Sequence, residues 1–242
     1  MIDLSEHVLI CGASSGVGRE LALTYAGKCK LTLSSRRVDR LLTISDAHKS
    51  IQAIQSDFSQ LSEMDKLVET AVELNGKLDK VFYVAGEQNI KPHKKLNVDD
   101  LSRLMNVNLI SPMRLGSLFL QNKFSNESSV YGVISSIAGI SPEPGIVAYS
   151  TTKAGLNSFV SGLAKETTCG RRVFAVAPSW LDTEMTQKFK VIYSDRFKEE
   201  FAKKTPLGLG TISQVVDALV WLSSDKASYV NGSVLKLDGG LI

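Results

Sequence analysis

The sequence predicts an α/β fold: a doubly wound parallel seven-stranded sheet with helices on both faces. Short apolar runs alternate with longer amphipathic stretches along the whole chain. Several of these runs are continuously apolar, which is typical of parallel strands buried on both faces. Helical segments separate the strands, as right-handed parallel crossovers require. We therefore expect ligands to bind beyond the carboxyl ends of the strands.

Seven apolar segments are the predicted strands. In chain order they are HVLIC (7–11), KLTLS (30–34), IQAIQSD (51–57), KVFYVAG (80–86), VYGVISS (130–136), RVFAVAP (172–178) and SVLKLDGG (233–240). The stretches between them carry helical periodicity, as in 60–75, where the apolar side chains fall mostly on one side. Helices are also expected from the Gly-rich turn to about residue 26, over 99–122, 148–166 and 213–224, with a polar helical region before the last.

Length and composition favour a single domain spanning 1–242. The chain has 242 residues, of which 43% are hydrophobic, and this is ample for one core. It contains no internal repeat or linker-like segment. No apolar run approaches the roughly 18 residues of a membrane span, and the N-terminus lacks the basic region of a signal peptide. We expect no membrane association.

Charge, cysteine and histidine usage exclude further classes of protein. The net charge of +3 is too small to indicate a nucleic-acid partner. The three Cys residues lack CxxC spacing, which favours reduced thiols and a cytoplasmic location. The three His residues are scattered without ligand-like spacing, so we expect no metal site.

A Gly-rich turn, GASSGVG (12–18), follows the first predicted strand and opens a helix. Glycines permit a tight turn and let backbone N–H groups approach phosphates, while a helix N-terminus favours negative charge. A flexible strand–helix connection would also contain glycines. The position between the first strand and the first helix favours nucleotide binding.

Tyr149 and Lys153 lie four residues apart in the stretch AYSTTKAG (148–155). Four residues correspond to roughly 400° of helical rotation, so both side chains emerge on nearly the same face. A nearby cation favours phenolate and lowers the pKa of a tyrosine from its usual value of about 10. Many surface helices contain such a pair by accident.

Taken in order, the motifs of this chain resemble those of the classical short-chain dehydrogenases/reductases. The matching motifs are GASSGVG (12–18), Asp57, YVAG (83–86), Asn108, Ser136, YSTTK (149–153) and DGG (238–240). They cover essentially the whole chain at the spacings usual in that family. The resemblance implies an oxidoreductase with a Rossmann-type domain, a nicotinamide cofactor and a mobile substrate lid at about 183–207.

The resemblance also implies a catalytic set of Asn108, Ser136, Tyr149 and Lys153. Tyr149 would protonate a substrate carbonyl as hydride arrives, with Ser136 holding the carbonyl oxygen opposite the phenol. Lys153 would acidify Tyr149 and donate to the nicotinamide ribose. Asn108 would help to hold a water that links Lys153 to solvent. Ser135 competes with Ser136, but a thirteen-residue separation from Tyr149 favours Ser136.

Cofactor choice is expected at the end of the second strand. NAD-binding relatives carry an acid there for the ribose 2′-OH, whereas NADP-binding ones offer Arg. Here Ser35 is followed by Arg36 and Arg37, and no carboxylate stands at this position. Guanidinium groups bind a 2′-phosphate bidentately, so we expect NADP(H), although a solvated turn would also explain two arginines.

Further cofactor contacts follow from the resemblance. They are Gly12, Ser14, Ser15, Gly16, Val17, Gly18, Asp57, Phe58, Ala85, Gly86, Tyr149, Lys153, Pro178, Ser179, Leu181 and Thr183. Three positions depart from the family. Tyr83 and Val84 stand where two Asn are typical, so a hydrogen bond between strands is expected to be lost or replaced. Ser179 stands where Gly is usual. These departures leave a non-catalytic NADP(H)-sensing protein as a remote alternative, which the intact catalytic set disfavours.

The subgroup that the chain resembles is the 3-oxoacyl-[acyl-carrier-protein] reductases. Substrate-facing segments are expected at 86–97, 137–148 and 183–207. The last of these is rich in Lys and Arg, and KPHKK (91–95) and Arg171-Arg172 add positive charge. These bases would receive an acidic acyl carrier protein. A solvated surface is the alternative, and the runner-up function is a carbonyl reductase for a free small molecule or secondary metabolite.

The resemblance further implies a homodimer or homotetramer, with the homotetramer expected. Assembly would use helices 99–122 and 148–166 and the C-terminal strand. Small or apolar residues in the second helix allow close packing, although core burial would leave the same pattern. These residues are Ala154, Phe159, Gly162 and Leu163.

Overall fold

One seven-stranded parallel sheet forms the centre of the computed structural model, which describes residues 5–46, 48 and 50–242. The strands are β1 (His7–Cys11), β2 (Lys30–Ser35), β3 (Ile51–Gln55), β4 (Leu78–Tyr83), β5 (Ser125–Ile134), β6 (Arg172–Pro178) and β7 (Val234–Leu237). Their order is β3-β2-β1-β4-β5-β6-β7, and every neighbouring pair is parallel. The predicted doubly wound fold is confirmed, with its topological switch between β1 and β4.

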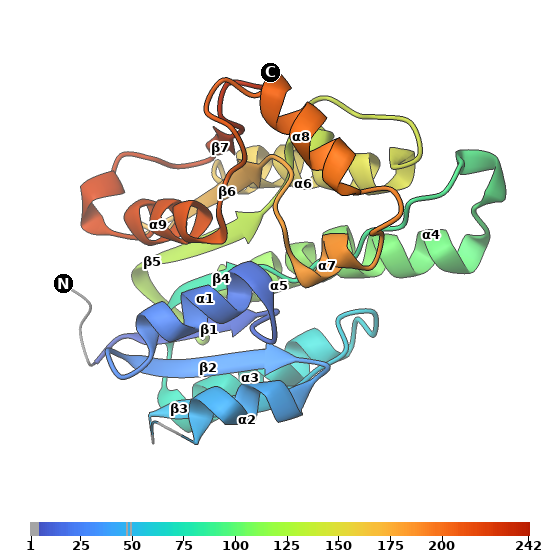
Figure 1. Cartoon of the computed structure of the whole chain (residues 1–242). Helices are drawn as coiled ribbons and strands as arrows, with labels where there is room; N and C mark the ends of the chain where they lie inside the picture. The colour runs from blue at the N-terminus through green and yellow to red at the C-terminus, as the bar shows by residue number, and fades with distance from the viewer. Residues whose placement is uncertain (1–4, 47, 49) are drawn as a thin grey trace.

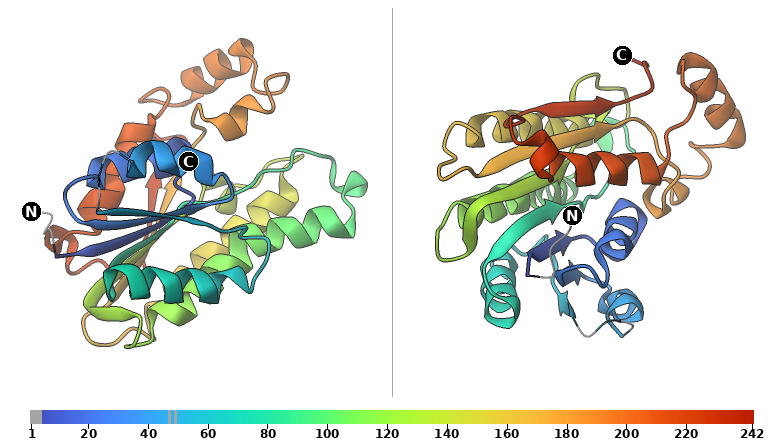
Figure 2. Two further views of the ribbon diagram at one scale, coloured as in Figure 1. Left: turned by 90° about the horizontal axis from the view of Figure 1, so that it is seen from below. Right: turned by 90° about the vertical axis from the view of Figure 1, so that its left-hand side faces the viewer.

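Helices cover both faces of the sheet (Figures 1 and 2). On one face lie α1 (Gly16–Tyr25), α2 (Val38–Ser45) and α9 (Ile212–Leu222). On the other lie α3 (Glu63–Asn75), α5 (Ser111–Phe119) and α6 (Val147–Leu163), with α4 (Val98–Met105) leading into α5. Short 3₁₀ turns complete the chain at η1 (His93–Lys95), η3 (Ile137–Gly139) and η4 (Asp225–Ala227).

Strand β1 shows why the apolar runs are continuous. Val8 and Ile10 pack into the core beneath α1 and α9, while Leu9 and Cys11 pack into the core beneath α3 and α5. Successive side chains of a strand point to opposite faces, so a strand covered on both sides needs apolar residues at every position.

The helix expected over 99–122 is divided, so that prediction was wrong in its middle and at its end. Between α4 and α5 the chain makes a π-helical turn, η2 (Asn106–Ile110), and α5 ends at Phe119. The N–H of Ser111 donates five residues back, to the carbonyl of Asn106. Pro112 has no N–H for the next bond of a regular helix, which fits a widened turn at this point.

Other boundaries also differ from the sequence prediction. Helix α2 was not expected, although Leu41 and Ile44 bury its inner face. β5 begins at Ser125, earlier than 130, whereas β3 and β7 end before their predicted limits. The parts of the expected domain at 1–4, 47 and 49 lie outside the described residues.

Arg171 and Arg172 are buried, so the expectation that they add surface charge was wrong. Arg171 donates to several acceptors near the start of β5, including the carbonyl of Ser125 at 3.0 Å. Arg172 donates to the carbonyl of Leu222 at 2.9 Å, at the end of α9. Both guanidinium groups therefore satisfy backbone carbonyls inside the fold, where an unpaired carbonyl would be costly.

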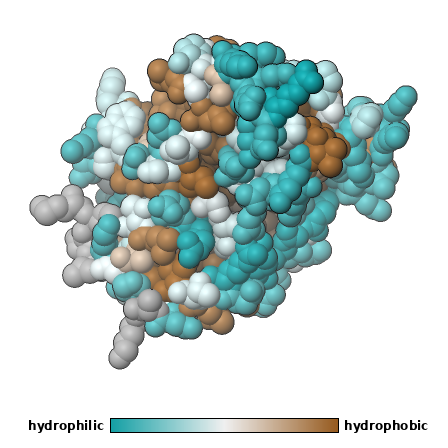
Figure 3. Space-filling view, viewed as in Figure 1, coloured by the Kyte–Doolittle hydropathy of each residue, from teal (hydrophilic) through white to brown (hydrophobic). Residues whose placement is uncertain are grey.

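Two short helices, α7 (Glu184–Gln187) and α8 (Asp195–Lys204), project over the carboxyl edge of the sheet (Figure 1). They divide the segment that was expected to form a substrate lid. Figure 3 shows hydrophilic side chains over α8 at the top of the molecule and over the projecting α4 at its right. Among the helices within 5–46, 48 and 50–242, none is long and apolar enough to cross a membrane.

Candidate active site

A cleft of about 790 Å³ opens at the carboxyl edge of the sheet, beneath α7 and α8. It is lined by almost all of the residues that the sequence proposed for cofactor and catalysis. These are Gly12, Ser14, Ser15, Gly16, Val17, Gly18, Ser35, Arg36, Arg37, Asp57, Phe58, Ala85, Gly86, Ser136, Tyr149, Pro178, Ser179, Leu181 and Thr183. The two remaining residues, Asn108 and Lys153, are buried at 1% and 3% exposure.

The Gly-rich turn has no room for side chains at two of its glycines. Gly12 has φ +99°, and a Cβ atom there would lie 2.5 Å from the backbone nitrogen of Ala85. A Cβ atom on Gly18 would lie 2.2 Å from the carbonyl oxygen of Gly12. The start of α1 therefore packs closely against β1 and β4. Residues 14–18, at the N-terminus of this helix, line the cleft, where backbone N–H groups favour a phosphate.

Arg37 is anchored to this turn and is already paired with a carboxylate. Its guanidinium donates to the hydroxyls of Ser14 at 3.0 Å and Ser15 at 2.9 Å. It also donates to Glu184, the first residue of α7, at 2.8 Å. The sequence shows no acid at the end of the second strand, but folding brings one there from 147 residues further on.

The carboxylate of Glu87 forms ion pairs with two further arginines, Arg36 and Arg103. Arg103 binds its carboxylate through two nitrogens, at 2.8 and 2.6 Å, and Arg36 binds it at 2.8 Å. Asp57 lies nearby and accepts a hydrogen bond from the backbone N–H of Ser59 at 3.0 Å. Sequence reasoning did not find Glu87 as a site residue. Its position directly after the Gly86 that ends the YVAG motif was the available signal.

Asn108 fastens the loop after β4 to helix α6. Its Oδ1 accepts from the N–H of Glu87 at 2.8 Å, and its Nδ2 donates to the Glu87 carbonyl at 2.8 Å and to Thr152 at 3.2 Å. Gly86 lies between Asn108 and Lys153: a Cβ there would be 3.6 Å from the Asn108 oxygen and 3.7 Å from Lys153 Nζ. The amide thus holds the backbone next to the buried lysine.

Lys153 and Tyr149 share one face of α6, as their spacing predicted. Lys153 Nζ lies 5.7 Å from the centre of the Tyr149 ring and donates to the carbonyl of Ile134 at 2.7 Å. Burial lowers the pKa of Lys153 to about 8. Burial also raises the pKa of Tyr149 to about 12, although the Ser136 hydroxyl opposes this. The expected acidification by Lys153 is not among the influences on this pKa, desolvation is the largest of them, and at neutral pH the phenol is protonated.

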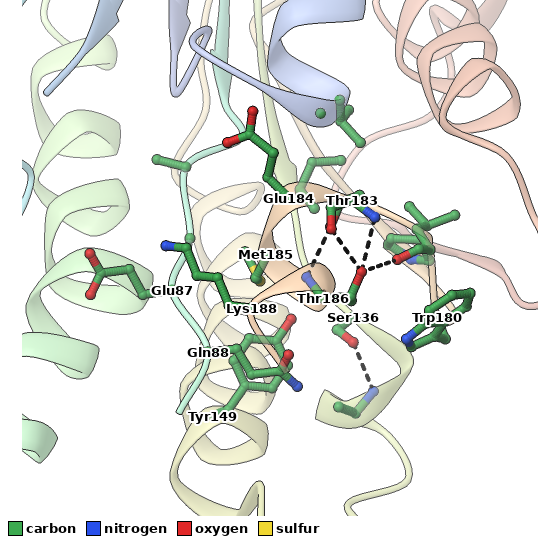
Figure 4. A pocket seen from close by; sticks show the side chains of 18 of the residues that line it. Glu87, Gln88, Ser136, Tyr149, Trp180, Thr183, Glu184, Met185, Thr186 and Lys188 are labelled. Carbon is green, nitrogen blue, oxygen red and sulfur yellow. Dashed lines mark hydrogen bonds between the residues drawn. The ribbon is translucent and has the colours of Figure 1, made fainter. Parts of the chain in front are cut away.

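The two candidate serines point to different partners. Ser136 Oγ accepts from the N–H of Ala138 at 3.1 Å and faces the cleft beside Tyr149 (Figure 4). Ser135 Oγ donates to Asn157 at 2.5 Å and is buried against α6. The geometry thus gives Ser136 access to a ligand and gives Ser135 a structural bond.

Aromatic side chains form the outer wall of the cleft; the sequence predicted 183–207 to face the substrate but did not single out any of these rings. Trp180, Tyr193 and Phe197 contact one another with ring centres 5.1 to 5.9 Å apart, and Phe201 stacks on Phe197 at 5.6 Å. Tyr193 accepts from Gln88 at 3.0 Å. Tyr193, Phe197 and Phe201 recur every four residues, which was the available signal. Trp180 Nε1 is buried without a partner among the described residues, on the side of the ring that faces Ser136 (Figure 4).

This doubly wound fold, with its Gly-rich turn and its Ser136–Tyr149–Lys153 group, has the architecture of a nicotinamide-dependent oxidoreductase. The chain belongs to the short-chain dehydrogenase/reductase family, whose members bind nicotinamide cofactors. Residues 12–242 match the family model described as Enoyl-(Acyl carrier protein) reductase. Within 5–46, 48 and 50–242, no three His, Cys, Asp or Glu side chains are grouped to hold a metal ion.

Individual relatives agree with this assignment over the full length. The chain is 30% identical to "Uncharacterized oxidoreductase YmfI" of Bacillus subtilis, over 98% of this chain and 99% of that protein. It is also 30% identical to "3-oxoacyl-[acyl-carrier-protein] reductase FabG" of Rickettsia felis, over 100% and 99%. Among solved structures, an SDR:glucose/ribitol dehydrogenase from Brucella melitensis superposes with a TM-score of 0.90 at 26% identity, covering 100% and 98%.

Proposed function

We propose that the protein catalyses the NADPH-dependent reduction of a carbonyl to a secondary alcohol, with a 3-oxoacyl thioester on an acyl carrier protein as substrate. The observation that carries this is the placement of the Ser136 and Tyr149 hydroxyls together in the cleft, with the Lys153 ammonium behind them. Similarity to proteins named 3-oxoacyl-[acyl-carrier-protein] reductase supports the substrate class.

The residues present fit a dinucleotide. The close contacts at Gly12 and Gly18 leave backbone at the cleft wall, and the N-terminus of α1 favours the pyrophosphate. Arg36 and Arg37 line the adjoining end of the cleft and would bind a 2′-phosphate. Bound NADPH would supply hydride to the carbonyl carbon.

The chain's own groups would handle the oxygen and the proton. Ser136 donates a hydrogen bond to the carbonyl oxygen, and Tyr149, protonated at neutral pH, transfers its proton to the developing alkoxide. Lys153 remains charged at pH 7 because its pKa of about 8 lies above it, and it stabilises the phenolate that Tyr149 becomes. Asn108 holds the backbone of Glu87 in place beside this group.

The aromatic wall favours a second candidate substrate, a free apolar ketone. Trp180, Tyr193 and Phe197 offer ring faces to a flat or cyclic molecule, and Arg171 and Arg172 are not on the surface to receive an acidic carrier.

NADPH oxidation should be measured with a carrier-bound 3-oxoacyl thioester, its free thioester analogue and a series of aryl ketones. We expect the carrier-bound substrate to be favoured, with an advantage that declines as salt is added.

Two results would decide against parts of this proposal. Equal efficiency on carrier-bound and free substrates, unaffected by salt, would exclude carrier recognition and favour the free ketone. Oxidation of NADPH only by a 2-enoyl thioester would exclude a carbonyl substrate. Assembly as a homotetramer is also part of the proposal, and light scattering of the purified protein measures it directly.

A further inference from the structure

Glu184 ties the first turn of α7 to the end of β2 and the start of α2. Its carboxylate accepts from Arg37 Nη1 at 2.8 Å and from Arg40 Nη1 at 2.5 Å. The two arginines lower the pKa of Glu184, with Arg37 the larger influence, so the carboxylate is charged at neutral pH. Figure 4 shows Glu184 projecting from α7 away from Ser136 and Tyr149, toward the region where α1 begins.

Three of the five N–H groups of the Arg37 guanidinium serve these contacts. One terminal nitrogen binds Glu184, and the other binds the hydroxyls of Ser14 and Ser15. Arg37 is also the group proposed to bind a 2′-phosphate. A guanidinium presents its donors in one plane, so a phosphate that approaches Nη1 from the side of Glu184 competes with the carboxylate for the same donor.

The ion pair between Arg37 and Glu184 is weak enough for a phosphate to displace the carboxylate. The side chains of Arg37 and Glu184 are 42% and 44% exposed, and ion pairs of this exposure are weak. A dianionic phosphate with three acceptor oxygens is a stronger partner for two arginines than one carboxylate is. Leaving both anions on Arg37 would place like charges side by side.

Displacement of Glu184 would move more than one side chain. Thr183 and Thr186 cap α7 reciprocally, and Thr186 also donates to the carbonyl of Leu181 at 3.0 Å, so the turn behaves as one unit. Met185 and Lys188, on the same turn and just after it, line the cleft. A shift of Glu184 would therefore move Met185 and Lys188 and change the opening through which a substrate enters the cleft.

We propose that Glu184 is a latch that the cofactor releases: it holds α7 against Arg37 and Arg40 until a 2′-phosphate displaces it. NADP(H) then frees α7 at the mouth of the cleft, whereas NAD(H), which has no 2′-phosphate, leaves the latch closed. This inference rests on the proposed use of Arg37 for NADP(H). It makes Glu184, 147 residues from Arg37, a determinant of cofactor preference.

The test compares wild type, Glu184→Gln and Glu200→Gln by calorimetric titration with NADPH and NADH. Glu184→Gln removes the competing charge, so NADPH should bind about three- to tenfold more tightly, the effect of losing an exposed ion pair or two. NADH binding should stay within about twofold. Glu200 lies on α8 and, in the part of the chain that the structure describes, its ion pair is with exposed Arg196, so its variant should bind both nucleotides as wild type does.

Hydrogen exchange of the α7 amides gives a second readout. In wild type, exchange at 184–187 should rise with NADPH and not with NADH, and in Glu184→Gln it should be raised without nucleotide. Unchanged NADPH affinity in Glu184→Gln would overturn the latch. Weaker binding of NADH would also overturn it, because Glu184 would then be a ribose ligand.

The cofactor proposal fails separately from the latch. If Arg37→Gln leaves NADPH binding unchanged, Arg37 is not the 2′-phosphate site, and the proposed NADP(H) preference loses its basis. If Arg37→Gln weakens NADPH at least tenfold while Glu184→Gln changes nothing, the preference stands and only the latch is wrong.

Discussion

The Tyr83 hydroxyl donates a 2.6 Å hydrogen bond to the backbone carbonyl of Val107, joining the end of β4 to the π-helical turn η2. In a regular helix that carbonyl would accept from Ser111, whose N–H here reaches Asn106 instead. Tyr83 therefore binds a carbonyl that the π turn leaves free. The bond runs from a strand to a helical turn, and so differs from the bond between strands that the sequence expected to be lost or replaced here.

Tyr83→Phe should destabilise the protein by about 1–3 kcal/mol, because it leaves the buried Val107 carbonyl without its donor. It should also lower kcat several-fold, since Asn108 follows Val107 directly. Urea unfolding and steady-state kinetics measure the two effects. Tyr131→Phe is the matched control: it loses a buried bond to the Pro112 carbonyl, 2.8 Å long, but does not touch this turn. Equal loss of kcat in both variants would contradict a positioning role for Tyr83.

Tyr149→Phe should lower turnover by about 10²- to 10⁴-fold, the usual contribution of a general acid. NADPH binding should persist, because the ring and Lys153 remain. Rapid-mixing kinetics and fluorescence titration separate the two quantities. Tyr193→Phe is the control, since Tyr193 also lines the cleft and its hydroxyl accepts from Gln88. Activity retained in Tyr149→Phe would rule out the proposed proton donor.

Lys153→Met should stabilise the protein at pH 7 by about 1–2 kcal/mol while abolishing activity. Burial lowers the pKa of Lys153 from its usual 10.5 to about 8, so the folded state binds this proton less tightly than the unfolded state. Wild-type stability should therefore rise with pH between about 8 and 10.5, as the unfavourable buried charge is lost.

The variant should lack this rise, and denaturant unfolding across that pH range measures it. Lys203→Met, on the exposed surface of α8, should leave the slope as in wild type. A slope that persists in Lys153→Met would assign the titration to another group.

Gly12→Ala should abolish nucleotide binding and cost several kcal/mol, because it combines a φ of +99° with a contact of 2.5 Å to the Ala85 nitrogen. Gly76→Ala separates strain from crowding: its φ is +88°, but a Cβ there meets nothing within 4 Å. That variant should lose only about 1 kcal/mol and bind NADPH normally. Similar losses in both would show that backbone strain alone, rather than packing against β4, governs the turn.

Local pattern was sufficient for most of the fold. β1 and β6 are buried on both faces, so after the first residue of each strand, His7 and Arg172, their sequences are apolar at every position and are recognisable without neighbours. Helix α2 was not predicted from the sequence because it is short and its start has no side-chain cap. The π-helical turn at η2 was not predicted because one residue added to a helical turn barely changes the periodicity of the apolar side chains.

The candidate site divides in the same way. The sequence by itself determined the Gly-rich turn and the shared helix face of Tyr149 and Lys153, because a strand end and a helical spacing fix where such positions lie, and the resemblance to the family added Ser136. Only the tertiary structure decided that Glu184 reaches Arg37, that Arg171 and Arg172 are buried, and that desolvation is the largest influence on the pKa of Tyr149. Charge pairing and burial depend on distances across the folded chain, and no spacing along the sequence records them.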